Sequence, residues 1–232
     1  MAKRLDLIER HLRPSAKRFL DCGCGTGEYV LALIERFGLD AYGVEFEADK
    51  IQQAHSKMAL RNRVTRGDLQ AIHFASCTWD YALLNEVLEH VPDDRKALRE
   101  VYRILKPGGL LFIFSPNRWF PFETHGVHLR QSDRRVPHWV PFIPYIPVRL
   151  GKIAFDYWAR NYGQRELAEM VNASGFFIVE RTFVWLTFED ISGRQPHLIR
   201  AAKPLLRLIS NTLERVPILK RFGVSQVLVC RK

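Results

Sequence analysis

Phe19-Leu20-Asp21-Cys22-Gly23-Cys24-Gly25-Thr26-Gly27 is the stretch that decides the fold of this chain. A short apolar run ends in the acid Asp21, and glycine then occupies every second position. The residues that follow, Glu28 to Ile34, carry apolar side chains at helical spacing. A strand, a tight backbone turn and a helix in this order form the opening unit of a nucleotide-binding α/β fold.

The glycines allow the backbone to close around a ligand because no side chain stands in the way. A dinucleotide-binding fingerprint, G-x-G-x-x-G, would require glycine at position 28, where this chain has Glu28. A carboxylate at a helix N-terminus, where a pyrophosphate group would bind, argues against NAD and FAD. The motif alone is also compatible with a turn that binds no ligand, so further motifs along the chain are needed to distinguish the two.

Strands and helices alternate along most of the remaining sequence. Strands are expected at about 18–22, 41–44, 64–66, 79–84, 110–114, 176–184 and 224–229. Helices are expected at about 3–12, 28–37, 48–60, 94–105 and 165–173. This alternation predicts an α/β fold in which a mostly parallel sheet is wound by right-handed crossovers.

The pattern D-x-G-x-G-x-G, formed by Asp21 and the glycines, resembles the first signature of the Rossmann-like (class I) S-adenosylmethionine-dependent methyltransferases. Further elements of that family follow in the family's order. They are Glu45, Arg66-Gly67-Asp68-Leu69, Asn85 to Val91 and Leu105-Lys106-Pro107-Gly108-Gly109. The resemblance implies a doubly wound, mostly parallel seven-stranded sheet with an inserted substrate cap. It also implies S-adenosylmethionine as the cofactor and S-adenosylhomocysteine as its product.

The resemblance places the cofactor at the carboxyl ends of the strands. Glu45 follows the glycines at about the distance where such folds carry an acid for the ribose hydroxyls, and the family assigns it that role. Asp68 would contact the adenine amino group, and Leu69 would offer a backbone donor. The expected cofactor-binding residues are Asp21, Gly23, Cys24, Gly25, Gly27, Glu45, Phe46, Asp68, Leu69, Asn85 and Glu86.

Two insertions interrupt the sheet pattern after residue 117. Residues 118–160 are rich in Trp, Phe, Pro and Arg, and include the run from Trp139 to Pro147. We expect an S-adenosylmethionine-binding core at 1–117, a cap insertion at 118–160, and the end of the sheet core at 161–232. The last part contains a second, helical insertion at about 186–222. We interpret both insertions as one cap over the active site.

A base is expected because an oxygen nucleophile must lose its proton when it accepts the methyl group. His125 is the preferred base, since imidazole titrates near neutral pH. His128 is a second catalytic candidate, and Glu123 is a further reserve. A histidine that only forms hydrogen bonds within a rigid loop is the competing interpretation of His125.

No metal is expected, although one cluster could hold a divalent ion. Glu86, Glu89 and His90 would share one face of a helix, and His125 or His128 could complete the site. A small-RNA 2′-O-methyltransferase family has a similar cluster, but the same segment is widespread in metal-free small-molecule methyltransferases. No second, well-spaced ligand group supports a metal.

Composition favours a cytoplasmic protein with one elaborated α/β domain. The chain has 232 residues, of which 47% are hydrophobic, and no apolar run approaches the roughly 20 residues needed to cross a bilayer. No apolar leader follows the N-terminal cations, so no secretory signal is expected. The four cysteines show neither metal-ligand spacing nor a disulfide framework, which indicates a reducing compartment.

The formal net charge of +10 is concentrated outside the cofactor core. Residues 200–232 hold eight Lys and Arg against one acid. A helix over 198–213 would be amphipathic. Its apolar face would carry Leu198, Ala202, Leu205, Ile209 and Leu213, and its basic face Arg200, Lys203 and Arg207. Pro204 is expected to divide this helix into two pieces or to delay its start. Such a helix could lie peripherally on the inner, anionic membrane face. A cap helix with a solvated basic face is the competing interpretation, and it is the one that such a pattern more often indicates.

These features predict a methyltransferase that acts on a small molecule, with oxygen on an apolar, glycan or lipid-linked compound as acceptor. The order of the motifs resembles that of bacterial small-molecule and quinone-type O-methyltransferases. An RNA methyltransferase is an alternative that the charge supports, although no RNA-recognition module is identified. A non-catalytic protein that binds S-adenosylmethionine is another. The sequence makes no prediction of oligomeric state.

Overall fold

The computed structural model describes residues 1–232 except 133, 138–139, 147, 158 and 186–196. Trp139, Pro147 and the beginning of the second insertion therefore lie outside the described residues. The chain divides into two compact units, which we treat separately. The sheet unit comprises Leu5–Ser115, Arg165–Arg181 and Val227–Lys232. The insertion unit comprises Met1–Arg4, Pro116–Gln164 and Thr182–Gln226.

A mixed, mostly parallel sheet of seven strands has the order β3-β2-β1-β4-β5-β9-β8. Its strands are β1 (Arg18–Cys22), β2 (Asp40–Glu45), β3 (Val64–Arg66), β4 (Trp79–Asn85), β5 (Leu105–Pro116), β8 (Phe177–Val184) and β9 (Ser225–Arg231). β1 pairs in parallel with both β2 and β4, so the direction of winding reverses between β1 and β4. In such sheets ligands bind at the carboxyl ends of the strands beside this switch point.

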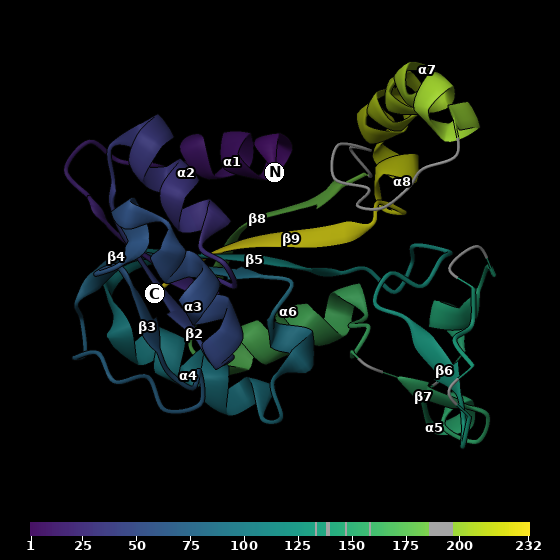
Figure 1. The fold of residues 1–232 in the computed structure, drawn as a ribbon, viewed down its shortest axis with the longest axis horizontal. Coiled ribbons are helices and arrows are strands. Elements are labelled where there is room, and N and C mark those ends of the chain that lie inside the picture. The colour runs from purple at the N-terminus through teal and green to yellow at the C-terminus, as the bar shows by residue number, and fades with distance from the viewer. Residues whose placement is uncertain (133, 138–139, 147, 158, 186–196) are drawn as a thin grey trace. The chain divides into compact units, whose positions relative to one another are not determined.

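The sheet is doubly wound, as predicted, because helices cover both of its faces. Figure 1 shows α2 (Glu28–Phe37) and α3 (Ala48–Ser56) on one face, and α4 (Asp94–Ile104) and α6 (Gln164–Ala173) on the other. α1 (Ala2–Glu9) precedes the first strand. Local signals set the helix ends. Gly38, with a left-handed φ of 61°, caps the C-terminus of α2. Asp93 caps the N-terminus of α4 because its side chain accepts a hydrogen bond from the N–H of Lys96.

The buried centre of the sheet holds the strand ends in place. Phe19 of β1 stacks on Tyr81 of β4 and on Phe112 of β5, with ring centroids 5.6 Å and 6.1 Å apart. All three side chains are fully buried. Each buried aromatic side chain contributes about 1.5–3 kcal/mol by leaving water. β1, β4 and β5 are therefore packed tightly against one another, and the residues at their carboxyl ends follow from this core.

Three predicted boundaries were wrong by three residues or more. The leading helix, expected over 3–12, ends at Glu9. The helix expected over 48–60 ends at Ser56, and a separate 3₁₀ turn, η1, spans Met58–Leu60. β5 begins at Leu105 rather than 110, because residues 106–109 form a bulge within the strand instead of a turn before it. The register shifts there, from Trp79 opposite Leu105 to Tyr81 opposite Leu110.

The insertion unit contains a small two-stranded sheet and a long helix. β6 (Val127–Leu129) pairs in an antiparallel manner with β7 (Phe155–Tyr157), while η3 (Ile143–Tyr145) and α5 (Val148–Gly151) lie between them in the chain. α7 (His197–Arg215) and α8 (Pro217–Lys220) form its second half. α7 runs unbroken through Pro204, so the expected division of this helix was wrong. Proline removes a single backbone donor there without ending the helix.

Buried amides join the two insertions into one unit. Asn117 donates from Nδ2 to the carbonyls of Arg221 and Gly223, at 2.8 Å each. Gln226 donates from Nε2 to the carbonyls of Tyr162 and Pro116, at 3.0 Å and 3.2 Å. The two insertions are thus parts of one compact body, and its role as a cap over the acceptor stays a prediction.

Candidate active site

The glycine turn follows β1 and leaves a space beside its middle residue. Gly23, Gly25 and Gly27 all have positive φ, at 81°, 53° and 79°. A Cβ at Gly23 would lie 2.6 Å from the Val87 side chain, so the backbone passes too close for any other residue. A Cβ at Gly25 would meet nothing within 4 Å. The turn is therefore tightly packed at Gly23 and open at Gly25, as a ligand-binding cradle requires.

Glu45 joins the end of β2 to this turn. Its Oε2 accepts from the N–H of Gly25 at 2.7 Å, and its Oε1 accepts from the N–H groups of Phe46 and Glu47 at 2.8 Å and 2.9 Å. An ionised carboxylate has about four acceptor sites, so one remains for a ligand hydroxyl. The next residue in the chain, Phe46, has an exposed ring.

Asp21 is buried at the end of β1, and its Oδ1 has no hydrogen-bond partner among the described residues. Burial, and to a lesser degree the charge of Glu45, raises the pKa of Asp21 from 3.8 to about 8. A buried carboxyl oxygen without a donor is rare in folded proteins. It fits a ligand that brings a donor or a positive charge, and S-adenosylmethionine carries both.

Cys24 lies in the turn, but its thiol is a packing group. Burial raises the pKa of Cys24 and keeps the thiol neutral. Gly43 of β2 lies against the Cys24 side chain, and a Cβ there would collide with its sulfur. The backbone of Cys24 donates to the carbonyl of Val44 at 3.0 Å. Any contact of Cys24 with the cofactor is thus expected from its backbone.

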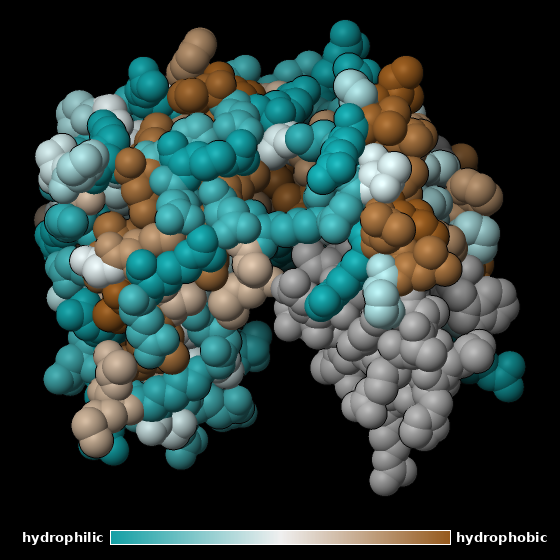
Figure 2. Space-filling view, turned by 90° about the horizontal axis from the view of Figure 1, so that it is seen from above, coloured by the Kyte–Doolittle hydropathy of each residue, from teal (hydrophilic) through white to brown (hydrophobic). Residues whose placement is uncertain are grey.

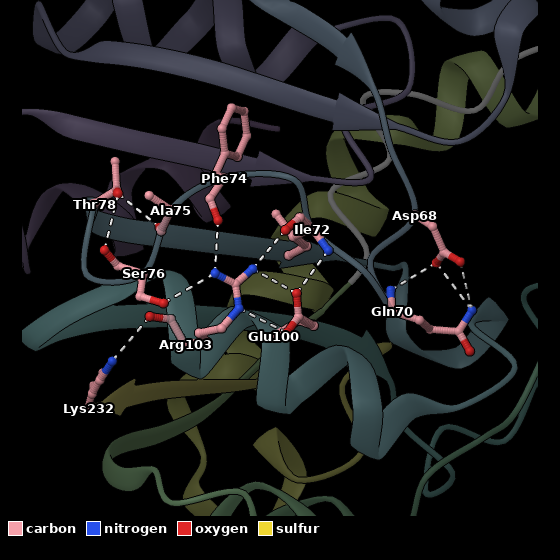
Figure 3. Close-up of polar contacts among 10 residues, drawn as sticks. All are labelled: Asp68, Gln70, Ile72, Phe74, Ala75, Ser76, Thr78, Glu100, Arg103 and Lys232. Carbon is pink, nitrogen blue, oxygen red and sulfur yellow. Dashed lines mark hydrogen bonds and ion pairs between the residues drawn. The ribbon is translucent and has the colours of Figure 1, made fainter.

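Asp68 follows β3 and is held by Gln70, a residue that the sequence did not single out. Asp68 Oδ1 accepts from the backbone N–H of Gln70 at 2.8 Å and from its side-chain amide at 3.2 Å (Figure 3). Gln70 Oε1 in turn accepts from the N–H of Asp93, at the start of α4, at 3.1 Å. Gln70 therefore orients the carboxylate, while the neighbouring Leu69 is buried.

Arg103 of α4 anchors the loop that follows Asp68 (Figure 3). Its guanidinium donates to the carbonyls of Ile72 and Phe74 at 2.7 Å and 2.9 Å, and it is paired with Glu100 at 2.8 Å. Glu100 also accepts from the N–H of Ile72 at 2.9 Å. The hydrogen bond from Arg103 is the main cause that lowers the pKa of Glu100. The loop is therefore fixed to α4 at both its N–H and carbonyl groups.

The segment after β4 is not the helix that the metal hypothesis assumed. Asn85 ends the strand, and Glu86 has a left-handed φ of 55°, with its N–H bonded to the carbonyl of Phe114 at 2.8 Å. Only Leu88–His90 form a 3₁₀ turn, η2. Glu86 therefore does not share a helical face with Glu89 and His90. A non-glycine residue at positive φ costs about 1–3 kcal/mol and is concentrated at functional sites.

The sheet unit brings together all the expected cofactor-binding residues. They lie at the ends of the neighbouring strands β1, β2, β3 and β4 or directly after them. The glycine turn and Glu45 are in contact, and Val87 packs against the turn at Gly23. Their individual contacts with a cofactor stay predictions.

In the insertion unit, Glu123 holds the loop that carries His125. The buried Glu123 accepts from the N–H of His125 at 3.0 Å and from Nδ2 of Asn161 at 2.7 Å. The hydroxyl of Thr124 lies 3.1 Å from Nδ1 of His125. Glu123 thus uses both oxygens to shape the loop, which suits a positioning residue better than a base. His128 lies on β6 opposite Asp156 of β7.

Comparison with known proteins gives one consistent result. Residues 2–181 match a family model described as a methyltransferase domain. Demethylmenaquinone methyltransferases of Geobacillus stearothermophilus and Geobacillus sp. (strain WCH70) are 30% and 33% identical to this chain over 190 residues, which cover 76% of it and 78% of each relative. The crystal structure of an S-adenosylmethionine-dependent methyltransferase from Mesorhizobium loti has the same fold, with a TM-score of 0.62 at 18% identity. The match covers 98% of this chain and 96% of the Mesorhizobium loti chain.

Proposed function

This chain belongs to the class I S-adenosylmethionine-dependent methyltransferases, and from that premise we propose that it methylates an apolar, quinone-type small molecule. Membership makes the chain a methyltransferase, which sets the non-catalytic alternative aside. The observation that carries the acceptor is the similarity to two enzymes named for demethylmenaquinone, over three quarters of both chains. The aromatic and proline-rich insertion is consistent with an apolar acceptor.

The sheet unit binds and orients the cofactor in this proposal. S-adenosylmethionine, when bound, supplies a methyl group on a positively charged sulfonium. Glu45 offers its remaining acceptor site to a ribose hydroxyl, and Asp68, oriented by Gln70, accepts from the adenine amino group. Asp21 supplies a buried carboxyl group for the cationic part of the cofactor, which favours its ionised form.

His125 acts as the base toward a ring hydroxyl of the acceptor. When its Nδ1–H donates to the hydroxyl of Thr124, Nε2 is the nitrogen that takes the proton. Glu123 keeps the histidine in place through the backbone. Loss of the proton makes the ring electron-rich at its oxygen and at the neighbouring ring carbon. We propose oxygen as the acceptor atom, and NMR of the product, in which a methoxy group and a ring methyl group have different shifts, distinguishes it from carbon.

The test is methyl transfer by the purified protein to a reduced naphthoquinone carrying a free ring position and hydroxyls, in detergent. We expect a product in the organic phase that is heavier by one CH₂, because a methyl group replaces the proton that the base removes. His125→Ala should lower kcat by about 10²- to 10⁴-fold and leave the affinity for S-adenosylhomocysteine unchanged. His128→Ala, measured alongside, shows which histidine is the base. Transfer only to RNA, in a nuclease-sensitive form, would reject the quinone proposal in favour of the RNA alternative.

The location follows from the acceptor. None of the described helices is long and apolar enough to cross a membrane. An apolar acceptor dissolves in the bilayer, so we propose a cytoplasmic enzyme with peripheral contact at the inner, anionic face of the membrane.

A further inference from the structure

α7 exposes a stripe of apolar side chains. Leu205, Leu208 and Ile209 are 60%, 63% and 46% exposed, and Val216, just after the helix, is 40% exposed. Leu205, Leu208 and Ile209 are three and four residues apart, a spacing that falls on one face of a helix. Apolar residues also reach the surface elsewhere, as Figure 2 shows for one face of the molecule, but Met58 and Phe177, for example, do so without such a repeat. The repeat on α7 therefore indicates a surface made for contact.

The polar side of α7 is the one that packs against the insertion unit. Ser210 is 3% exposed, and Glu214 is paired with Lys3 at 2.6 Å. Glu214 also accepts from the N–H of Trp185 at 3.0 Å. Leu205 and Ile209 therefore point away from the insertion unit, to which α7 belongs. The side chains of residues 197–203 and 206 lie outside the description, so this orientation rests on the second half of the helix.

α8 extends the exposed stripe and adds positive charge beside it. Ile218 is 73% exposed and Leu219 is 39% exposed. Arg215, Lys220 and Arg221 lie next to these side chains in the chain. The one acid between 205 and 221 is Glu214, which is occupied by Lys3. The α7–α8 surface, defined by Leu205, Leu208, Ile209, Val216, Ile218 and Leu219, is thus apolar and bordered by cations.

We propose that the α7–α8 surface docks on an anionic lipid membrane. Its apolar side chains would enter the headgroup boundary, while the neighbouring cations meet lipid phosphates. A second copy of this chain fits less well, because its matching surface would bring the same cations, on a protein of net charge +10, against each other. The surface is inferred from α7 and α8 alone, and only its purpose, access to a membrane-dissolved acceptor, rests on the proposed function.

The test is co-sedimentation of the full chain with vesicles of phosphatidylcholine, with and without phosphatidylglycerol. We expect binding to the anionic vesicles that weakens as salt is raised. Leu208→Gln combined with Ile209→Gln should reduce partitioning about tenfold or more, because two apolar side chains no longer leave water. Arg215→Gln with Arg221→Gln should reduce binding to the anionic vesicles only. Met58→Gln, which removes an equally exposed apolar side chain from η1, is the matched control and should bind like the unaltered protein.

Three results would overturn the docking proposal. They are no binding to anionic vesicles, equal binding by the Leu208 and Ile209 variant, and self-association that this variant abolishes while vesicles bind nothing. These measurements involve no methyl transfer. A failure of vesicle binding would therefore overturn the docking proposal alone. The proposed acceptor is tested separately, by the quinone assay.

Discussion

Replacing Glu45 with glutamine separates the binding role of this residue from a merely structural one. The carboxylate accepts three backbone N–H groups, of which only that of Gly25 comes from the glycine turn. In Glu45→Gln the amide oxygen can keep the bonds to Phe46 and Glu47, but an NH₂ group then faces the N–H of Gly25. The lost bond to a charged acceptor costs about 1.5–3 kcal/mol of folding free energy.

A ribose hydroxyl that donates to the same carboxylate would lose a similar amount. We therefore expect S-adenosylhomocysteine to bind to Glu45→Gln about ten- to 150-fold more weakly, in addition to the stability loss. Titration calorimetry gives the affinity and thermal unfolding gives the stability. Glu47→Gln is the matched control, because the exposed side chain of Glu47 pairs with Lys50 at 2.7 Å and its substitution should change neither value appreciably. Unchanged affinity in Glu45→Gln, or an equal loss in Glu47→Gln, would refute the assignment of the ribose to Glu45.

Three further predictions concern the turn, the buried acid and the Arg103 anchor. The pKa of Asp21 is raised from 3.8 to about 8, so the folded state holds the proton more tightly than the unfolded state, and stability should fall as pH rises from about 4 to about 8. The melting temperature of Asp21→Asn should lack this fall, and the same pH dependence in both proteins would contradict the raised pKa. Gly23→Ala and Gly25→Ala should both destabilise the protein, because alanine is strained at positive φ, but Gly23→Ala should lose more stability because its Cβ also collides with Val87. Gly25→Ala, whose Cβ meets nothing within 4 Å, should in addition weaken cofactor binding; thermal melts and calorimetry compare the two, and unchanged cofactor affinity in Gly25→Ala would argue against a ligand there. Arg103→Gln should lower the free energy of unfolding, measured in urea, by about 1–3 kcal/mol, because the carbonyls of Ile72 and Phe74 lose a charged donor. A decrease below about 0.5 kcal/mol would show that other contacts hold the loop.

Local patterns predicted the first half of the fold closely. Strand β1 and helix α2 have the bounds expected from the apolar run, the glycines and the helical spacing, because each signal lies within the element itself. The bulge in β5 was missed because residues 106–109 resemble a turn, and only pairing with β4 shows that the strand continues past them.

Residues that act across the chain left no signal in the sequence. Gln70 and Arg103 look like ordinary polar residues until the fold brings Asp93 and the loop carbonyls to them. The orientation of α7 also could not be predicted from the sequence, because it depends on contacts with distant parts of the chain. Its amphipathic pattern was visible, but only the burial of Ser210 and the pairing of Glu214 with Lys3 show which side faces the protein.

The most direct test of the account is to follow a radiolabelled methyl group from S-adenosylmethionine into an extract of the host cells, with phase partition and then nuclease treatment. We expect label in the organic phase that is insensitive to nuclease and is lost in the His125→Ala variant. Label confined to the aqueous phase would contradict an apolar acceptor.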